Sequence, residues 1–288
     1  MKYEFVAAKS IIQNGNSVNL YWGCTHNCIY CDSRSECYNK PNFETIKVKK
    51  DCIKIFTEEI YRKKQWCLIS TGAMCDPYIP LEEEVKLTKD MLEIILKRKF
   101  GVGLLTKSDL ILRDLELIKA INKESKAVVQ MTIITTDDKL CSLLEPNVCL
   151  SSRRFEVLKT FADAGVPTGI WLAPVLPFIC DNPENIRDIV FKAHQANVKF
   201  ILCFGIGTSK RKGSEEYFYA CLDKSFPGLK EKYIRTYGSQ YICSSPREKE
   251  LYKVLAFECQ KYGILYKGQD IKNLFRRKKQ FKQLSIFD

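Results

Sequence analysis

Three cysteines lie close together near the start of the chain, in the stretch GCTHNCIYCDSRSEC (residues 23–37). Cys24, Cys28 and Cys31 are separated by three residues and then by two. Thiolates spaced this closely can hold a metal ion or an iron–sulfur cluster. A structural zinc site needs four protein ligands, usually completed by a distant second pair, and no C-x-x-C pair follows later in the sequence.

Zinc remains an alternative in which His26 and Cys37 would complete the ligand set. His26, however, lies inside the tight loop between two of the cysteines, and Cys37 lacks a usual zinc spacing. A 4Fe–4S cluster on three thiolates keeps one iron open to bind a small molecule. The triplet therefore favours a cluster with an open iron.

Six apolar runs alternate with helical patterns in the first two thirds of the chain. Strands are expected at residues 17–22, 66–70, 101–106, 126–134, 168–174 and 198–204. Continuously apolar strands are typical of a parallel sheet covered by helices. Six units are too few for an eight-stranded barrel, so the sequence predicts an α/β fold, a partial (β/α)6 TIM-like barrel. Ligands of such folds bind at the C-terminal ends of the strands, and the cysteines directly follow the first strand.

The pattern changes after about Gly205, where the chain becomes aromatic, charged and mostly helical. A clear helix start is expected at Ser245 and Pro246. We therefore divide the chain into a barrel core (residues 1–205), a helical C-terminal extension (206–271) and a basic tail (272–288).

Composition limits the class of protein and its partners. The sequence has no apolar run of about 18 residues and no signal-peptide pattern, so we expect a cytoplasmic protein without a membrane partner. In a reducing cytosol, clustered cysteines bind metal or react more often than they form disulfides. The formal net charge of +12 favours nucleic acid as a partner, with solubility alone as the alternative.

The cysteine spacing, with the aromatic Tyr30 before the last cysteine, resembles the radical S-adenosylmethionine (SAM) superfamily. Further stretches resemble its spore photoproduct lyase-like (DNA repair photolyase-like) branch: TGAMCDPYIPLE, LLTKSDLILRDLELI, TIITTDD and EPNVCLSSRRFEVLKTFADAGVPTGIWLAPVLPFICD. The resemblance covers residues 18–204. It implies a 4Fe–4S cluster on Cys24, Cys28 and Cys31, with SAM on the open iron and reductive cleavage of SAM to a 5′-deoxyadenosyl radical.

The resemblance also indicates a SAM site. Thr71, Gly72 and Ala73 would form the turn that meets the methionine amine, although Ala73 and Met74 replace the commoner second glycine and acid. The methionine carboxylate would bind Lys107 or Arg154, with Arg153 adjacent. A plain turn and solvated surface charges are the structural alternatives. The other expected SAM contacts are Gln130 and Thr132 at the ribose, and Tyr30 and Pro174 near the adenine.

Residues for substrate and catalysis are also suggested by the resemblance. Asp76, Tyr78 and Glu82 would face the substrate, with a buried salt bridge as the alternative. A lesion lyase of this branch returns a hydrogen atom to its product radical from a nearby cysteine or tyrosine. Cys75 and Cys37 are the candidates, with buried inert thiols as the alternative.

The basic tail ends in QLSIFD. Its residues Gln283, Leu284, Ser285, Ile286 and Phe287 resemble the pentapeptide by which bacterial DNA-processing proteins bind the sliding clamp. The basic residues 276–279 before it would lie on a DNA backbone. The alternative is a tail that packs on its own core.

Together these features predict a radical SAM enzyme that acts on DNA, with lesion repair and carbon–carbon lyase chemistry. It would extrude its target base and take electrons from a donor such as flavodoxin or ferredoxin. One alternative is radical chemistry on RNA, protein or a small molecule. Another is a non-catalytic iron–sulfur protein that binds DNA and the sliding clamp.

Overall fold

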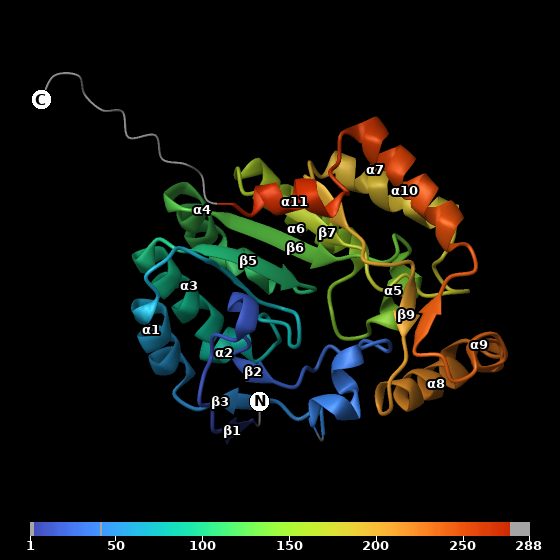
Figure 1. Ribbon diagram of the computed structural model, residues 1–288, viewed down its shortest axis with the longest axis horizontal. Helices are drawn as coiled ribbons and strands as arrows, with labels where there is room; N and C mark the ends of the chain where they lie inside the picture. The colour runs from blue at the N-terminus through green and yellow to red at the C-terminus, as the bar shows by residue number, and fades with distance from the viewer. Residues whose placement is uncertain (1–2, 41, 277–288) are drawn as a thin grey trace, which may run out of the picture.

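A five-stranded parallel sheet forms the centre of the computed structural model, which describes residues 3–40 and 42–276. The strand order follows the sequence: β4 (Leu68–Ser70), β5 (Gly101–Thr106), β6 (Ala127–Thr132), β7 (Thr168–Trp171) and β8 (Phe200–Leu202). Helices between the strands pack on the outer face of the sheet (Figure 1). The predicted α/β class with a parallel sheet is confirmed.

The helices that cover the sheet precede β4 or connect its strands. They are α1 (Cys52–Arg62), α2 (Glu82–Val85), α3 (Leu87–Arg98), α4 (Leu115–Glu124), α5 (Asp138–Leu144), α6 (Ser151–Asp163) and α7 (Pro183–Gln195). The helices α2 and α3 are separated at Lys86, whose φ of 55° is left-handed. The start of α7 follows the capping rules, because the Asn182 side chain accepts from the Asn185 amide and Pro183 occupies the first turn.

The first predicted strand is not a full member of the sheet. Ser17 forms only an isolated parallel bridge to Ser70 at the edge of β4. The chain then pairs through β2 (Tyr21–Trp22) with β3 (Lys47–Lys49), which also pairs with β1 (Glu4–Val6). A separate three-stranded sheet therefore leads into the cysteine loop.

The helix α11 (Gly268–Leu274) packs against the central sheet near the N-terminal ends of its strands. Val128, Phe200 and Ile271 form a small apolar core, and the Phe200 and Phe275 rings are 5.7 Å apart. In the register of the sheet, Gly169 of β7 lies between Gln130 of β6 and Phe200 of β8. The glycine leaves room for the Phe200 ring on this face of the sheet.

The rest of the extension contains an antiparallel strand pair that was not predicted. Its elements are β9 (Gly207–Ser209), α8 (Ser214–Ser225), α9 (Leu229–Tyr237), β10 (Ile242–Ser244) and α10 (Glu248–Tyr262). Figure 1 shows α10 beside α7, and one buried apolar core includes residues of both the barrel and the extension. No helix among residues 3–40 and 42–276 has the length and apolar character needed to cross a membrane.

Candidate active site

The three predicted cysteine ligands line one cavity of about 100 Å³ at the C-terminal ends of the strands. Cys24 and Cys28 are buried and Cys31 is half-buried. The loop begins at Gly23, whose φ is +87° and where a Cβ would lie 2.5 Å from the Phe43 carbonyl oxygen. That carbonyl accepts the Cys24 amide at 3.1 Å. Only glycine permits this close approach, so local backbone geometry directs the first thiol into the cavity.

The opposite wall of the cavity comes from the loop after β4 and from the ends of β5 and β6. Gly72 has a φ of +88°, and a Cβ there would lie 2.0 Å from the Leu105 carbonyl oxygen. Its backbone therefore lies directly against β5. Among the described residues, no group of three Cys, His, Asp or Glu side chains forms a ready metal site, and the three thiols are spread around the cavity wall.

Asp76 connects this loop to the cysteines. Its carboxylate accepts hydrogen bonds from the Thr106 hydroxyl (2.7 Å) and from the backbone amides of Lys107 and Tyr78 (2.8 Å each). The His26 Nδ1 atom lies 3.5 Å from the same carboxylate. Burial alone would lower the pKa of His26, but Asp76 and Cys24 outweigh it and the pKa is raised. Asp76 therefore holds the cysteine loop against the end of β5.

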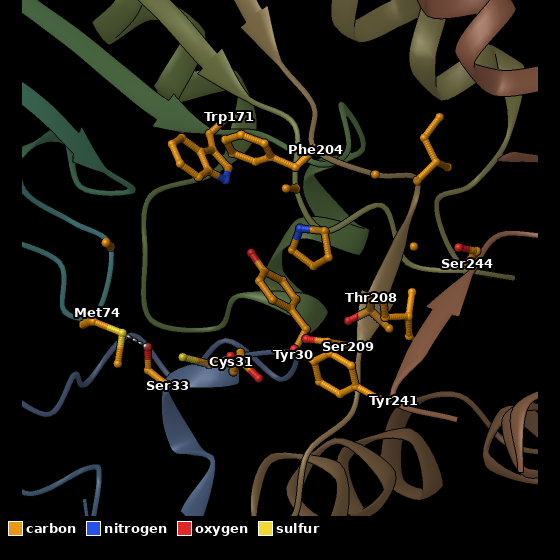
Figure 2. A pocket seen from close by; sticks show the side chains of 18 of the residues that line it. Tyr30, Cys31, Ser33, Met74, Trp171, Phe204, Thr208, Ser209, Tyr241 and Ser244 are labelled. Carbon is orange, nitrogen blue, oxygen red and sulfur yellow. Dashed lines mark hydrogen bonds between the residues drawn. The ribbon is translucent and has the colours of Figure 1, made fainter. Parts of the chain in front are cut away.

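A larger cleft of about 500 Å³ adjoins the cavity and shares Tyr30, Cys31, Ser33, Ala73 and Met74 with it. Figure 2 shows Trp171 and Phe204 on one side of this cleft and Tyr30 with Cys31 across from them. The remaining wall comes from the β9–β10 pair and includes Thr208, Ser209, Tyr241 and Ser244. The thiols thus lie beside a cleft with aromatic walls.

Two aromatic contacts shape the mouth of the cleft. Phe204 is 68% exposed, and its ring lies edge-on to Trp171 with centroids 5.0 Å apart. On the other side, the Arg211 guanidinium donates to the hydroxyls of Tyr38 and Tyr241, at 2.5 Å each. Arg211 therefore joins the segment after the cysteines to the C-terminal extension.

Comparison with protein families decides the class. The family model for the radical SAM superfamily matches residues 18–190, more than half of the chain. The chain belongs to the radical SAM superfamily. This agrees with the resemblance inferred from the cysteine spacing and Tyr30.

Curated relatives of this radical SAM protein are uncharacterised. A protein of Methanocaldococcus jannaschii is 32% identical over 166 residues, which cover 57% of this chain and 61% of the relative. A protein of Mycobacterium tuberculosis (strain ATCC 25618 / H37Rv) is 25% identical over 241 residues, covering 81% of this chain and 70% of the relative.

Solved structures share the fold at low sequence identity. A cysteine-to-serine mutant of spore photoproduct lyase superposes with a TM-score of 0.67 at 16% identity, covering 92% of this chain and 79% of the lyase. Spore photoproduct lyase complexed with dinucleoside spore photoproduct gives a TM-score of 0.64 at 16% identity, covering 87% and 75%. These likenesses establish the radical SAM fold of the chain.

The three basic residues considered for the SAM carboxylate occupy different environments in this radical SAM fold. Lys107 lines the thiol cavity. Arg154 is fully buried outside the cavity lining, where it pairs with Glu145 at 2.5 Å and donates to the Cys149 and Thr132 carbonyls. Arg153 lies on the surface and pairs with carboxylates of neighbouring residues. Lys107 is thus the only one of the three at the cavity.

Glu145 is a site residue that the sequence analysis missed, although it lies in the quoted stretch EPNVCL. It is buried, it accepts a hydrogen bond from the Tyr30 hydroxyl, and it pairs with Arg154. Burial would raise its pKa, but Arg154 and Lys107 outweigh burial, so the pKa is lowered and the group is ionised. Burial is also the first influence on the pKa of Lys107 and would lower it, but Cys28 and Glu145 raise the pKa overall.

Some of the other predicted SAM contacts line the thiol cavity or the cleft, and two line neither. Gly72, Ala73 and Thr132 line the thiol cavity, and Pro174 lines the cleft. Thr71 and Gln130 line neither, but the Thr71 Oγ1 and Gln130 Oε1 atoms are buried without a hydrogen-bond partner among the described residues. Because neither residue lines the cavity or the cleft, the structure does not assign a ligand contact to these two oxygens.

Two of the three residues predicted to face the substrate are directed elsewhere. Tyr78 is fully buried and donates to Asp114 at 3.1 Å, and Glu82 is fully buried and pairs with Arg113 at 2.7 Å. Neither lines the cavity or the cleft, and the buried salt bridge considered as the alternative describes Glu82. Both side chains are therefore buried with partners inside the protein in this structure. Of the three residues predicted to face the substrate, Asp76 alone lines the thiol cavity.

The two predicted hydrogen-atom donors are also separated. Cys75 lines the thiol cavity, and its Sγ donates to the Gly23 carbonyl at 2.7 Å. Cys37 is exposed and lies outside both the cavity and the cleft, where its sulfur accepts from Arg211 at 3.6 Å. The structure therefore brings only Cys75 to the site.

Proposed function

We propose that this radical SAM protein binds a 4Fe–4S cluster on Cys24, Cys28 and Cys31 and uses SAM to act on nucleic acid, with DNA as the favoured substrate. The observation that carries the proposal is the three-thiol cavity opening beside an aromatic cleft of about 500 Å³. When bound, the reduced cluster and SAM supply one-electron cleavage of the sulfonium to a 5′-deoxyadenosyl radical.

Residues of the cavity suit the parts of SAM. Lys107 would pair with the methionine carboxylate, because its ammonium is held at the cavity and Arg154 is already paired. A backbone carbonyl at the Gly72 turn would accept a hydrogen bond from the methionine amine, since glycine lets the chain come close. Tyr30 is fixed by Glu145 where the cavity meets the cleft and would pack beside the adenine, opposite Pro174.

The cleft suits a flat, aromatic substrate. Trp171, Phe204 and Tyr241 offer ring faces and edges on which a nucleobase can stack, a contact that every base can make. The net charge of +12 favours a polyanion, and the fold is that of a lyase seen in complex with a dinucleoside lesion. A base buried in a duplex would have to be extruded to reach this cleft.

We further propose lesion reversal by carbon–carbon bond cleavage as the reaction class, in the cytoplasm. Cys75 would be the hydrogen-atom donor, since it is the candidate that reaches the cavity. The alternatives, radical chemistry on RNA, protein or a small molecule, would use the same three cysteines and differ only in the substrate that the cleft binds. A flavodoxin or ferredoxin would supply the electron.

The test is anaerobic reconstitution with iron and sulfide, followed by reduction, addition of SAM and mass spectrometry of 5′-deoxyadenosine. Cys28→Ala is expected to lose the cluster and the product. Cys221→Ala is the matched control, because that thiol lies in α8 away from the cavity, and it should keep both. Full iron loading and SAM cleavage by Cys28→Ala would refute the proposed ligand set.

The substrate class is then tested with ultraviolet-irradiated DNA, undamaged DNA, RNA and no polymer. We expect irradiated DNA alone to stimulate SAM cleavage and to lose its lesions. Stimulation by RNA alone would support the first alternative. A fully loaded cluster that never cleaves SAM, with any polymer, would support the non-catalytic alternative.

A further inference from the structure

A second hollow lies on the other side of the cysteine segment from the cleft. This hollow, of about 540 Å³, is lined by residues that follow the cysteines and by the start of α8. We call it the Lys40 hollow; its lining residues are Arg34, Glu36, Asn39, Lys40, Asn42, Phe43, Gly213 and Tyr217. None of the functions proposed above uses it.

Phe43 separates the Lys40 hollow from the thiol cavity. This buried residue lines both, and its carbonyl oxygen accepts the Cys24 amide at 3.1 Å. The Lys40 nitrogen lies 5.8 Å from the centroid of the Phe43 ring and 5.6 Å from that of Trp22. A single aromatic residue therefore stands between the surface and the thiols.

The cations of the Lys40 hollow are held in place. Arg34 has a side chain that is only 9% exposed, it stacks 3.8 Å from the centroid of Tyr217, and its Nε has no hydrogen-bond partner among the described residues. Its other nitrogens bind Glu44 and Asn27. Lys40 is half-buried and makes no ion pair within the part of the chain that the structure describes. Glu36 of the same lining is paired with Lys212 at 3.0 Å, so the charge that the hollow offers to an outside partner is that of Lys40.

The cleft and the Lys40 hollow can be occupied together. The segment after the cysteines presents Ser33 and Tyr38 to the cleft, and Arg34 and Asn39 to the hollow. A third surface pocket also reaches the cavity, through His26, but among the described residues its lining contains the acids Glu83 and Asp109 and no lysine. The arginines of both sites are paired with carboxylates, so Lys40 is what distinguishes the Lys40 hollow as the better match for an anionic partner.

We propose that the Lys40 hollow is the docking site for an acidic one-electron carrier, a flavin or iron–sulfur protein, which reduces the cluster of the proposed function. The reduced carrier would be oxidised by one electron, which would pass to the cluster that Cys24, Cys28 and Cys31 would hold; Phe43 lies between the hollow and the cavity of these thiols. Electron transfer slows steeply with distance, so a site one residue from the thiols suits this role. Opposite charges on the two surfaces would speed and orient the encounter.

The first test measures binding of a reduced flavodoxin to the reconstituted protein at low salt. Lys40→Glu is expected to weaken the affinity about tenfold, because it reverses the charge at the centre of the hollow. Glu36→Lys, on the same lining, should tighten it several-fold. Lys253→Glu is the matched control, since that lysine is exposed on α10, and it should leave the affinity unchanged.

The second test measures the rate at which the same flavodoxin reduces the cluster. For each protein this rate is divided by the rate of reduction by dithionite, which needs no docking site. The flavodoxin-to-dithionite ratio should fall about tenfold in Lys40→Glu at low salt, and added salt should shrink the difference from the unmodified protein because it screens the charges. Equal affinities and ratios in all variants would overturn the docking site. A loss of DNA affinity in Lys40→Glu with unchanged flavodoxin affinity would assign the hollow to nucleic acid. Failure to load any cluster would instead refute the proposed function.

Discussion

Lys107 and Arg153 give a direct test of the SAM site at the scale of single residues. Lys107→Gln is expected to weaken SAM binding about 10- to 100-fold, as for loss of one charge-assisted hydrogen bond. Arg153→Gln should leave SAM binding unchanged, because Arg153 is paired at the surface. Calorimetric titration of the reconstituted proteins with SAM measures both. A larger loss in Arg153→Gln than in Lys107→Gln would reverse the assignment.

Arg154 has a structural role that can be measured separately. Arg154→Met leaves the buried Glu145 carboxylate without its partner, so the free energy of unfolding should fall by about 3–5 kcal/mol. The double variant Arg154→Met with Glu145→Gln removes both charges and should recover part of that loss. Urea denaturation of the three proteins checks the prediction. A single variant as stable as the unmodified chain would contradict it.

The sequence could predict the cysteines because their spacing is local, but it could not separate Lys107 from Arg154. Both follow strands of the sheet, and only the fold shows that Glu145 reaches Arg154 and Tyr30. For the same reason the buried partner of Glu82, which lies 31 positions away in Arg113, was beyond sequence reasoning. Pairings between distant residues depend on tertiary structure.

At the scale of elements, the concave face of the sheet is filled by rings at glycine positions. A Cβ at Gly169 would lie 2.1 Å from the Phe200 ring. Gly169→Ala should therefore lower the free energy of unfolding by about 1–3 kcal/mol through overpacking. Gly268→Ala is the control, since a Cβ there meets no atom within 4 Å. Thermal and urea denaturation measure both, and equal losses would show that ring packing is not the cause.

The alternation of strands and helices was predictable because apolar runs and helix caps are local signals. Two features were not. The β9–β10 pair consists of three-residue strands, which are too short to show a pattern. The first predicted strand has an apolar run, but its pairing with β3 instead of the sheet depends on a partner that lies 25 or more residues later.

At the scale of the whole molecule, the C-terminal ends of the sheet strands carry the candidate site, and their N-terminal ends are packed against the C-terminal extension. The thiol cavity and the cleft lie at the C-terminal ends of the strands, while α11 packs against their N-terminal halves through Ile271 and Phe275. Figure 1 shows α11 across β6 and β7, away from the small sheet that leads into the cysteines. The described chain ends at Arg276, five residues into the predicted basic tail, and the first of these residues belong to α11.

The predicted clamp motif lies outside the described residues, so clamp binding remains a proposal; its residues are Gln283, Leu284, Ser285, Ile286 and Phe287. Deleting residues 283–288 should weaken binding to a bacterial sliding clamp by on the order of tenfold or more, because two apolar anchors are lost. SAM cleavage should be unchanged, because these residues are not part of the proposed SAM site. Phe287→Ala, which removes one anchor and keeps the basic residues 276–279, should show a smaller loss.

Surface plasmon resonance on immobilised clamp and the 5′-deoxyadenosine assay, run on the same preparations, measure the two effects. The basic residues are kept in both variants, so non-specific attraction to an acidic clamp surface is the same in every comparison. Equal clamp affinity with and without residues 283–288 would rule out the motif. A parallel loss of SAM cleavage would show instead that the tail supports the barrel, as in the alternative of a tail packed on its own core.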